Sequence, residues 1–254
     1  MSFKTIAEIP RQVASRFPVI LISSAVQTVI VFINTLRWKK HSASLYAAQM
    51  STIDAVLFNC QRAFLSFVLP ILILNLSLIF SDDEHIRIAI RRKSRQSIWN
   101  ISVLKTAVLC ICFTLFYTAA ALLSAKFSGI SVAINWQSVR SVYYSANFTT
   151  TDRFTFSELL ILSTLYIFLT AFFVSMLFLI LKNLLGSVAG MIATVVFGIN
   201  EAWFAPILTR FSGLYHIQLT DEFNPLICLG LPTVLSAAAY FIGRKICLRK
   251  EFYC

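Results

Sequence analysis

Charged residues are scarce in this sequence: they make up 13% of its 254 residues, against about 25% in typical soluble domains. Hydrophobic residues, in contrast, make up 58% of the chain, and the mean hydropathy is +0.78. A soluble domain could not hide this much apolar surface from water. The composition therefore predicts an all-α membrane protein in which residues 1–254 form a single transmembrane domain.

The motifs of several enzyme classes are also missing. None of the seven glycines belongs to a GxxxxGK[ST] loop, which binds nucleotide phosphates, so we do not expect this chain to hydrolyse ATP by itself. The three histidines are far apart in the sequence and no HExxH motif occurs, so we expect no metal site. No GxSxG nucleophile motif is present either. We therefore predict that the chain is not an enzyme and holds no cofactor of its own.

The six cysteines lie mostly inside or beside apolar runs. Cys110 and Cys112 are two residues apart, which points them to different sides of a helix and excludes a zinc site or a redox pair between them. We expect the cysteines to act as small apolar packing residues.

Long hydrophobic runs are what the sequence has instead. A helix needs about 20 residues to cross the hydrocarbon core of a bilayer, and six runs meet that length. The predicted spans cover about 17–36, 63–80, 98–125, 159–181, 184–208 and 226–248. Only Lys182 and Asn183 separate the fourth span from the fifth, which predicts a tight antiparallel hairpin with close backbone approach at Gly186 and Gly190. Pro70 indicates a kink in the second span.

Basic residues orient these spans. Most of the 22 Lys and Arg residues fall in segments that are cytoplasmic when the N-terminus is inside, which predicts that both termini are cytoplasmic. The same bias, rather than nucleic-acid binding, accounts for the net charge of +11. Residues 1–16 are expected to form a short elbow helix on the inner surface. The outer loop 126–154 is aromatic and polar, which is typical of residues at headgroup level.

The densest charge lies between the second and third spans, in the sequence SDDEHIRIAIRRKSRQSIWNISVLK. Its acids come first, where a helix N-terminus favours negative charge, and its bases follow at helical spacing. This pattern predicts an amphipathic, basic helix on the cytoplasmic surface that receives force from a partner protein. The predicted coupling residues are Glu84, Arg87, Arg91, Arg92, Lys93 and Arg95.

Few strongly polar residues occur within the spans, and they are expected to face protein or water because exposing them to lipid is costly. The candidates for a substrate path are Gln27, Asn34, Asn75 and Glu201. Two interpretations of Glu201 stay open: it lies in the outer headgroups beside Trp203, or it lines the path. Lys105 is expected to extend its amine to the inner headgroups.

Three features of the charged segment resemble the permease subunits of type-2 ATP-binding-cassette exporters: the acid Glu84, the basic run 91–95, and Lys105 early in the third span. In that family the short basic helix is a coupling helix that docks in a cleft of the ATPase subunit. The layout is similar elsewhere too, in an elbow helix at 3–16, an outer re-entrant region at 203–223 and the Asn224-Pro225 opening of the sixth span.

The resemblance implies a multi-pass permease subunit in a bacterial plasma membrane. It would work as a homodimer or with a sister permease, together with two ATPase subunits that bind ATP and Mg. The expected cargo is an amphipathic or antimicrobial peptide. Alternatives are an exporter subunit for a lipid-linked glycan, a drug or an ion, and a structural or enzymatic membrane protein without a transport role. No nucleic-acid partner is expected.

Overall fold

The computed structural model describes residues 17–81, 95–204, 206, 214, 219 and 223–249. Within these residues the chain is helical and forms no strand. Five helices are long and apolar enough to cross a membrane. The predicted all-α fold is therefore confirmed, and the apolar helices support a multi-pass membrane protein.

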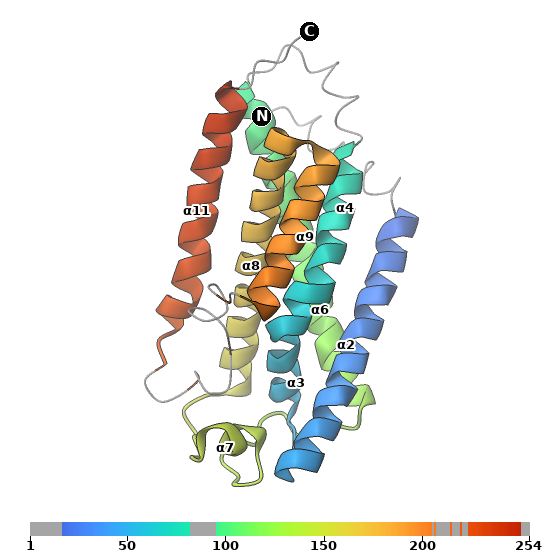
Figure 1. The fold of residues 1–254 in the computed structure, drawn as a ribbon. Coiled ribbons are helices and arrows are strands. Elements are labelled where there is room, and N and C mark those ends of the chain that lie inside the picture. The colour runs from blue at the N-terminus through green and yellow to red at the C-terminus, as the bar shows by residue number, and fades with distance from the viewer. Residues whose placement is uncertain are drawn as a thin grey trace.

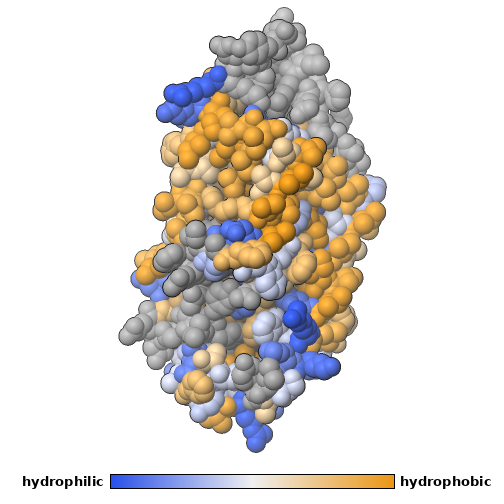
Figure 2. All heavy atoms as spheres, in the orientation of Figure 1, coloured by the Kyte–Doolittle hydropathy of each residue, from blue (hydrophilic) through white to orange (hydrophobic). Residues whose placement is uncertain are grey.

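The helices pack into one elongated bundle (Figure 1). In chain order they are α2 (Phe17–Tyr46), α3 (Thr52–Phe58), the π-helical stretch η1 (Asn59–Val68), α4 (Leu69–Ser81), α6 (Arg95–Phe127), α7 (Val142–Asn147), α8 (Phe156–Leu185), α9 (Ser187–Trp203) and α11 (Pro225–Arg249). Helix α8 is central, because it packs against α3, α4, α6, α9 and α11. Figure 2 shows large hydrophobic areas on the surface of the bundle, as a lipid-facing surface requires.

The long outer loop expected between the first two spans is mostly helical. Helix α2 continues past residue 36 to Tyr46, and α3 starts at Thr52, so only 47–51 remain as a connection. Ser51 caps α3: its hydroxyl accepts a hydrogen bond from the Asp54 N–H, and the Asp54 carboxylate accepts one from the Ser51 N–H. Hydropathy falls here because Lys and Arg are frequent, but these residues favour helix as strongly as apolar ones do.

The second predicted span belongs to a longer helical segment that breaks at Gln61. The backbone of Gln61 lies inside η1 but departs from helical geometry, with φ −89° and ψ −138°. A π-helical turn is one of the few causes of a sharp helix bend. The structure therefore places the break before Pro70, which lies in the first turn of α4, where proline is tolerated.

The fifth predicted span, 184–208, is shorter than expected. Helix α9 has 17 residues and ends at Trp203, below the roughly 20 residues that cross a bilayer. Figure 1 shows α9 ending partway along α8. The six expected spans are therefore five long helices and one short apolar helix.

The hairpin predicted between α8 and α9 is present, but its two glycines have different roles. Gly186 forms the turn, with φ +93°, a backbone conformation that favours glycine. Gly190 provides the close approach, because a Cβ atom there would lie 2.6 Å from the Lys182 backbone nitrogen.

The helix ends gather at two ends of the bundle (Figure 1). One, which we call the Arg95 end, holds the start of α2, the end of α4, the start of α6, the α8–α9 turn and the end of α11. The other, the α7 end, holds the end of α2, the starts of α3 and α8, and α7. Segment 82–94, with most of the predicted coupling residues, thus joins two helix ends at the Arg95 end. The expected elbow helix and both chain termini lie outside the described residues.

At the α7 end, the loop after α6 closes over the start of α3. Trp136 donates a hydrogen bond from Nε1 to Asp54 Oδ1 at 2.8 Å, and the indole stacks on Tyr143 with ring centroids 4.6 Å apart. Trp136, Tyr143 and Asp54 are all buried. The buried carboxylate of Asp54 thus has the indole as a nearby donor, and the prediction that this loop lies at headgroup level stays a prediction.

Candidate functional site

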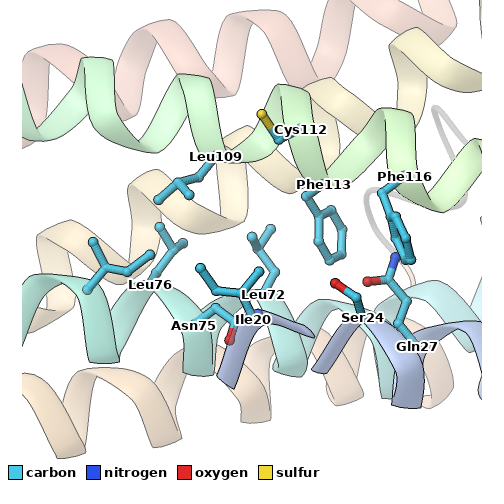
Figure 3. Close-up of a pocket in the computed structure, with 11 residues that line it drawn as sticks. Ile20, Ser24, Gln27, Leu72, Asn75, Leu76, Leu109, Cys112, Phe113 and Phe116 are labelled. Carbon is cyan, nitrogen blue, oxygen red and sulfur yellow. The ribbon is translucent and has the colours of Figure 1, made fainter. Parts of the chain in front are cut away.

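A cavity of about 260 Å³ lies between α2, α4 and α6 (Figure 3). Eleven residues line it: Ile20, Ser24 and Gln27 from α2, Leu72, Asn75, Leu76 and Ile79 from α4, and Leu109, Cys112, Phe113 and Phe116 from α6. None of them is charged. The lining is thus mostly apolar with a few polar groups, the composition typical of small-molecule sites.

The cavity follows from the course of α2. Figure 1 shows α2 beside α3 near the α7 end and farther from α4 toward the Arg95 end. The Ser23 hydroxyl of α2 lies 3.0 Å from Asn75 Oδ1 of α4 and 2.5 Å from the Val19 carbonyl oxygen of its own helix, so these two acceptors share its one proton. The same hydroxyl also lies 3.2 Å from the Ile20 carbonyl oxygen of its own helix.

Gln27 is the unusual residue of this site. Its side chain is 2% exposed, and its Nε2 has no hydrogen-bond partner in the part of the chain that the structure describes. Figure 3 shows its carboxamide beside the cavity, near Ser24 and Phe116. Leaving a buried amide group without a partner costs about 1–3 kcal/mol. No described residue offsets this cost.

The structure brings together two of the four predicted path residues, Gln27 and Asn75, and places the other two elsewhere. Asn34 does not line the cavity. Its Nδ2 donates to Asn59 Oδ1 at 3.0 Å, while Asn59 donates in turn to Thr35 Oγ1 at 3.0 Å. Tyr117 of α6 donates to the Asn59 carbonyl oxygen at 2.7 Å. Asn34 therefore belongs to a buried polar network that ties α2 and α6 to the start of η1.

Glu201 lies on the last turn of α9 and is 2% exposed. Both interpretations of Glu201 stay open, because burial within the protein does not fix its depth in the membrane. Glu201 does not line the cavity between α2, α4 and α6. Its neighbour Trp203 is exposed and donates a hydrogen bond from Nε1 to Ser66 Oγ at 2.7 Å, which fixes the end of α9 against η1.

The predicted coupling residues lie almost entirely outside the described part of the chain. These are Glu84, Arg87, Arg91, Arg92 and Lys93. Arg95 is the first residue of α6. Lys105 is buried, at 8% exposed, and whether its amine reaches the inner headgroups stays a prediction.

Sequence reasoning missed Lys182 as a structural residue, because a base between two apolar runs is typical of a loop. Lys182 is buried and donates from Nζ to the Phe80 carbonyl oxygen at 2.9 Å. Phe80 lies at the end of α4, where free carbonyl groups and the helix dipole favour a positive charge. The signal available in the sequence was the position of Lys182 in the last turn of α8.

The cavity is lined by apolar side chains, three uncharged polar residues and Cys112. Across the described residues, no group of three or more metal-ligating side chains comes together. Four cysteines are buried, Cys60, Cys110, Cys228 and Cys247, which fits the predicted packing role. Cys112 is exposed and lines the cavity.

The chain matches no family model, no curated protein and no solved structure.

Proposed function

We propose that this chain is the membrane-spanning permease subunit of an ATP-driven exporter in a bacterial plasma membrane. The observation that carries the proposal is the relation between the cavity and the basic segment. Helices α4 and α6 flank segment 82–94. Each of them supplies four of the eleven residues that line the cavity. A force applied to this segment would therefore move two walls of the cavity against the third, which α2 provides.

The contacts at the Arg95 end support this transmission of force. Lys182 ties the end of α4 to α8 through the Phe80 carbonyl oxygen. Trp99 packs against Gly243, which ties the start of α6 to α11. A displacement of the basic segment would then carry α4 with α8 and α6 with α11, as packed pairs rather than as isolated helices.

The partners follow from what the chain lacks. It has no phosphate-binding loop, so ATP and Mg would be bound by two separate ATPase subunits that dock on the coupling residues. A cavity of about 260 Å³ is smaller than the roughly 300–1,000 Å³ of sites for drug-sized ligands. A peptide path would therefore form between two permease chains, either identical or sister subunits.

The cargo that we propose is an amphipathic or antimicrobial peptide, because the spans are rich in phenylalanine and poor in charge. A lipid-linked glycan, a drug or an ion is the alternative cargo. A structural or enzymatic role without transport is the alternative function, and it predicts activity of the purified chain without any ATPase.

Co-purification tests the proposal. The tagged chain is extracted from its native host in mild detergent, and accompanying proteins are identified by mass spectrometry. We expect a protein with a GxxxxGK[ST] loop to accompany the wild type and to be lost from the triple variant Arg91→Glu/Arg92→Glu/Arg95→Glu. A matched control reverses three exposed charges at the α7 end, Lys40→Glu/Lys126→Glu/Arg140→Glu, and should keep the partner. Equal recovery of the ATPase with both variants would contradict the proposed docking segment.

A further inference from the structure

A groove between the starts of α8 and α11, which we call the α8–α11 groove, is charged at one end and apolar at the other. Its volume is about 400 Å³. Arg153 and Glu158 line it beside the start of α8, and Ile161, Leu162 and Leu165 continue the lining along that helix. The last four of these residues are spaced so that they share one face of α8. Over roughly 10 Å, the groove thus passes from charged to apolar.

This change of polarity follows the depth of the membrane. Helix α8 has 30 residues and is therefore about 45 Å long, which matches the roughly 40–45 Å of a bilayer with its headgroup regions. Its first turn, with Glu158, lies at headgroup level, whereas Leu165 lies two turns deeper, in the hydrocarbon. Ile161 and Leu165 are 60% and 43% exposed, so the apolar part of the groove is open to lipid. A molecule that fits the whole groove is therefore amphipathic.

Arg153 gives the groove a positive charge in a fixed position. Its Nη2 donates a hydrogen bond to the Phe223 carbonyl oxygen at 3.1 Å, and its Cζ lies 5.3 Å from the centre of the Phe154 ring. Phe154 and Phe223 meet edge to face, with ring centroids 6.1 Å apart, and both line the groove. A guanidinium group held in this way presents the planar donor geometry that matches a phosphate.

Glu158 adds a negative charge to the same groove. Its Oε2 accepts a hydrogen bond from the Thr155 N–H at 2.9 Å, which completes the capping box that starts α8. A carboxylate can accept about four hydrogen bonds, so capping the helix leaves room for a further donor. Two opposite charges beside an apolar groove match a headgroup that itself carries one anion and one cation.

We propose that the α8–α11 groove binds a phospholipid with an ethanolamine headgroup. The phosphate accepts hydrogen bonds from Arg153, the ammonium group donates to Glu158, and an acyl chain lies along the apolar residues of α8. A choline headgroup has the same charges but no N–H to donate. A glycerol headgroup has no cation and brings only a negative charge to Glu158. The groove lies at the opposite end of α8 from segment 82–94, so the proposal goes beyond the exporter function and does not depend on it.

Native mass spectrometry tests the choice of headgroup. The full chain in detergent is mixed with equal amounts of ethanolamine, choline and glycerol phospholipids, each with two oleoyl chains, and the first lipid bound is identified by its mass. For the wild type we expect the ethanolamine lipid to bind about two- to fivefold more tightly than either of the others, which is the gain expected from one exposed ion pair.

Variants of the two charged residues separate their roles. In Glu158→Gln the preference over the choline lipid should fall to about one, because glutamine keeps the capping box but not the charge. Asp152→Asn is the matched control, since Asp152 is an exposed acid of the same loop that does not line the groove. Arg153→Gln should weaken the binding of all three lipids, because each has a phosphate. Arg140→Gln, at an exposed base outside the groove, should leave it unchanged.

Three results would overturn the proposal: equal binding of the three lipids to the wild type, tightest binding of the glycerol lipid, and a preference for ethanolamine that persists in Glu158→Gln. If Glu158→Gln does not fold, the wild type alone decides. An N,N-dimethylethanolamine lipid keeps one N–H and should bind like the ethanolamine lipid. If it binds only as well as the choline lipid, no hydrogen bond to Glu158 sets the preference.

Discussion

Trp99 fills the space that a side chain on Gly243 would occupy. A Cβ atom built on Gly243 would lie 2.1 Å from Cη2 of the Trp99 indole, and Trp99 is 1% exposed. This contact joins the start of α6 to the end of α11, beside the attachment point of the basic segment. The spacing between these two helices therefore depends on the absence of a single methyl group.

Gly243→Ala should destabilise the protein by about 1–3 kcal/mol, because the buried Trp99 indole must shift to admit the added methyl group. The measurement is thermal unfolding followed by reaction of the four buried cysteines with a fluorogenic maleimide. Gly230→Ala on the same helix is the control, since a Cβ atom there meets nothing within 4 Å. A Gly243→Ala protein as stable as Gly230→Ala would show that the contact is not tight.

Lys182→Met should destabilise the bundle by about 1–3 kcal/mol, because the Phe80 carbonyl oxygen loses a charged donor and the end of α4 loses its nearby cation. The same unfolding assay measures the loss. Lys245→Met, at an exposed position of α11, is the matched control and should change stability by no more than about 0.5 kcal/mol. Equal melting temperatures for the two variants would argue against a structural role for Lys182.

The hydrogen bond between Trp136 and Asp54 should show a coupling of about 1.5–3 kcal/mol in a double-mutant cycle, because its acceptor is a buried carboxylate. The cycle uses Trp136→Phe, Asp54→Asn and the double variant. Asp152→Asn, at an exposed position of the same loop region, should couple to Trp136→Phe by less than about 0.5 kcal/mol. Strict additivity of Trp136→Phe and Asp54→Asn would contradict the role given to the indole.

Tyr117→Phe should cost about 1–3 kcal/mol, since it leaves the carbonyl oxygen of buried Asn59 without its hydroxyl donor. Tyr144→Phe serves as the control, because Tyr144 is only half-buried. The measurement compares the unfolding midpoints of the two variants with that of the wild type in the same detergent. An unchanged midpoint for Tyr117→Phe would mean that the polar network around Asn59 does not hold α2 against α6.

Hydropathy predicted most of the fold, because the transfer of apolar side chains from water fixes where long helices lie. It failed between residues 37 and 62, where a basic stretch is helical and a capping box at Ser51 and Asp54 starts a new helix. It also overestimated the fifth span: the apolar sequence continues to residue 208, but α9 ends at Trp203. Hydropathy measures affinity for lipid and contains no information on where the backbone changes direction.

The candidate site could be predicted only in part. Gln27 and Asn75 were predicted as site residues because an amide within a span is costly to expose to lipid and is expected to face protein or water. Both residues line the cavity. Asn34 carried the same signal, but its partner Asn59 is distant in sequence, so a structural network could not be told from a path residue. The apolar lining gave no signal, because a leucine beside a cavity and a leucine in a packed core are identical in sequence.

Among the described residues, helix α2 makes more hydrogen bonds to the rest of the protein near the α7 end than near Phe17. Near the α7 end, Lys39 donates from Nζ to the Ser128 carbonyl oxygen at 2.5 Å, and Asn34 joins the network around Asn59. Toward Phe17, the polar tie to another helix within the described residues is Ser23 with Asn75. These contacts hold α2 near Asn34 and leave its Phe17 end with fewer restraints. With about 1.5 Å of rise per residue, a tilt of about 5° about Asn34 would move Phe17 by roughly 2 Å and Gln27 by roughly 1 Å, so the cavity between α2 and α4 would change its width most toward the Arg95 end.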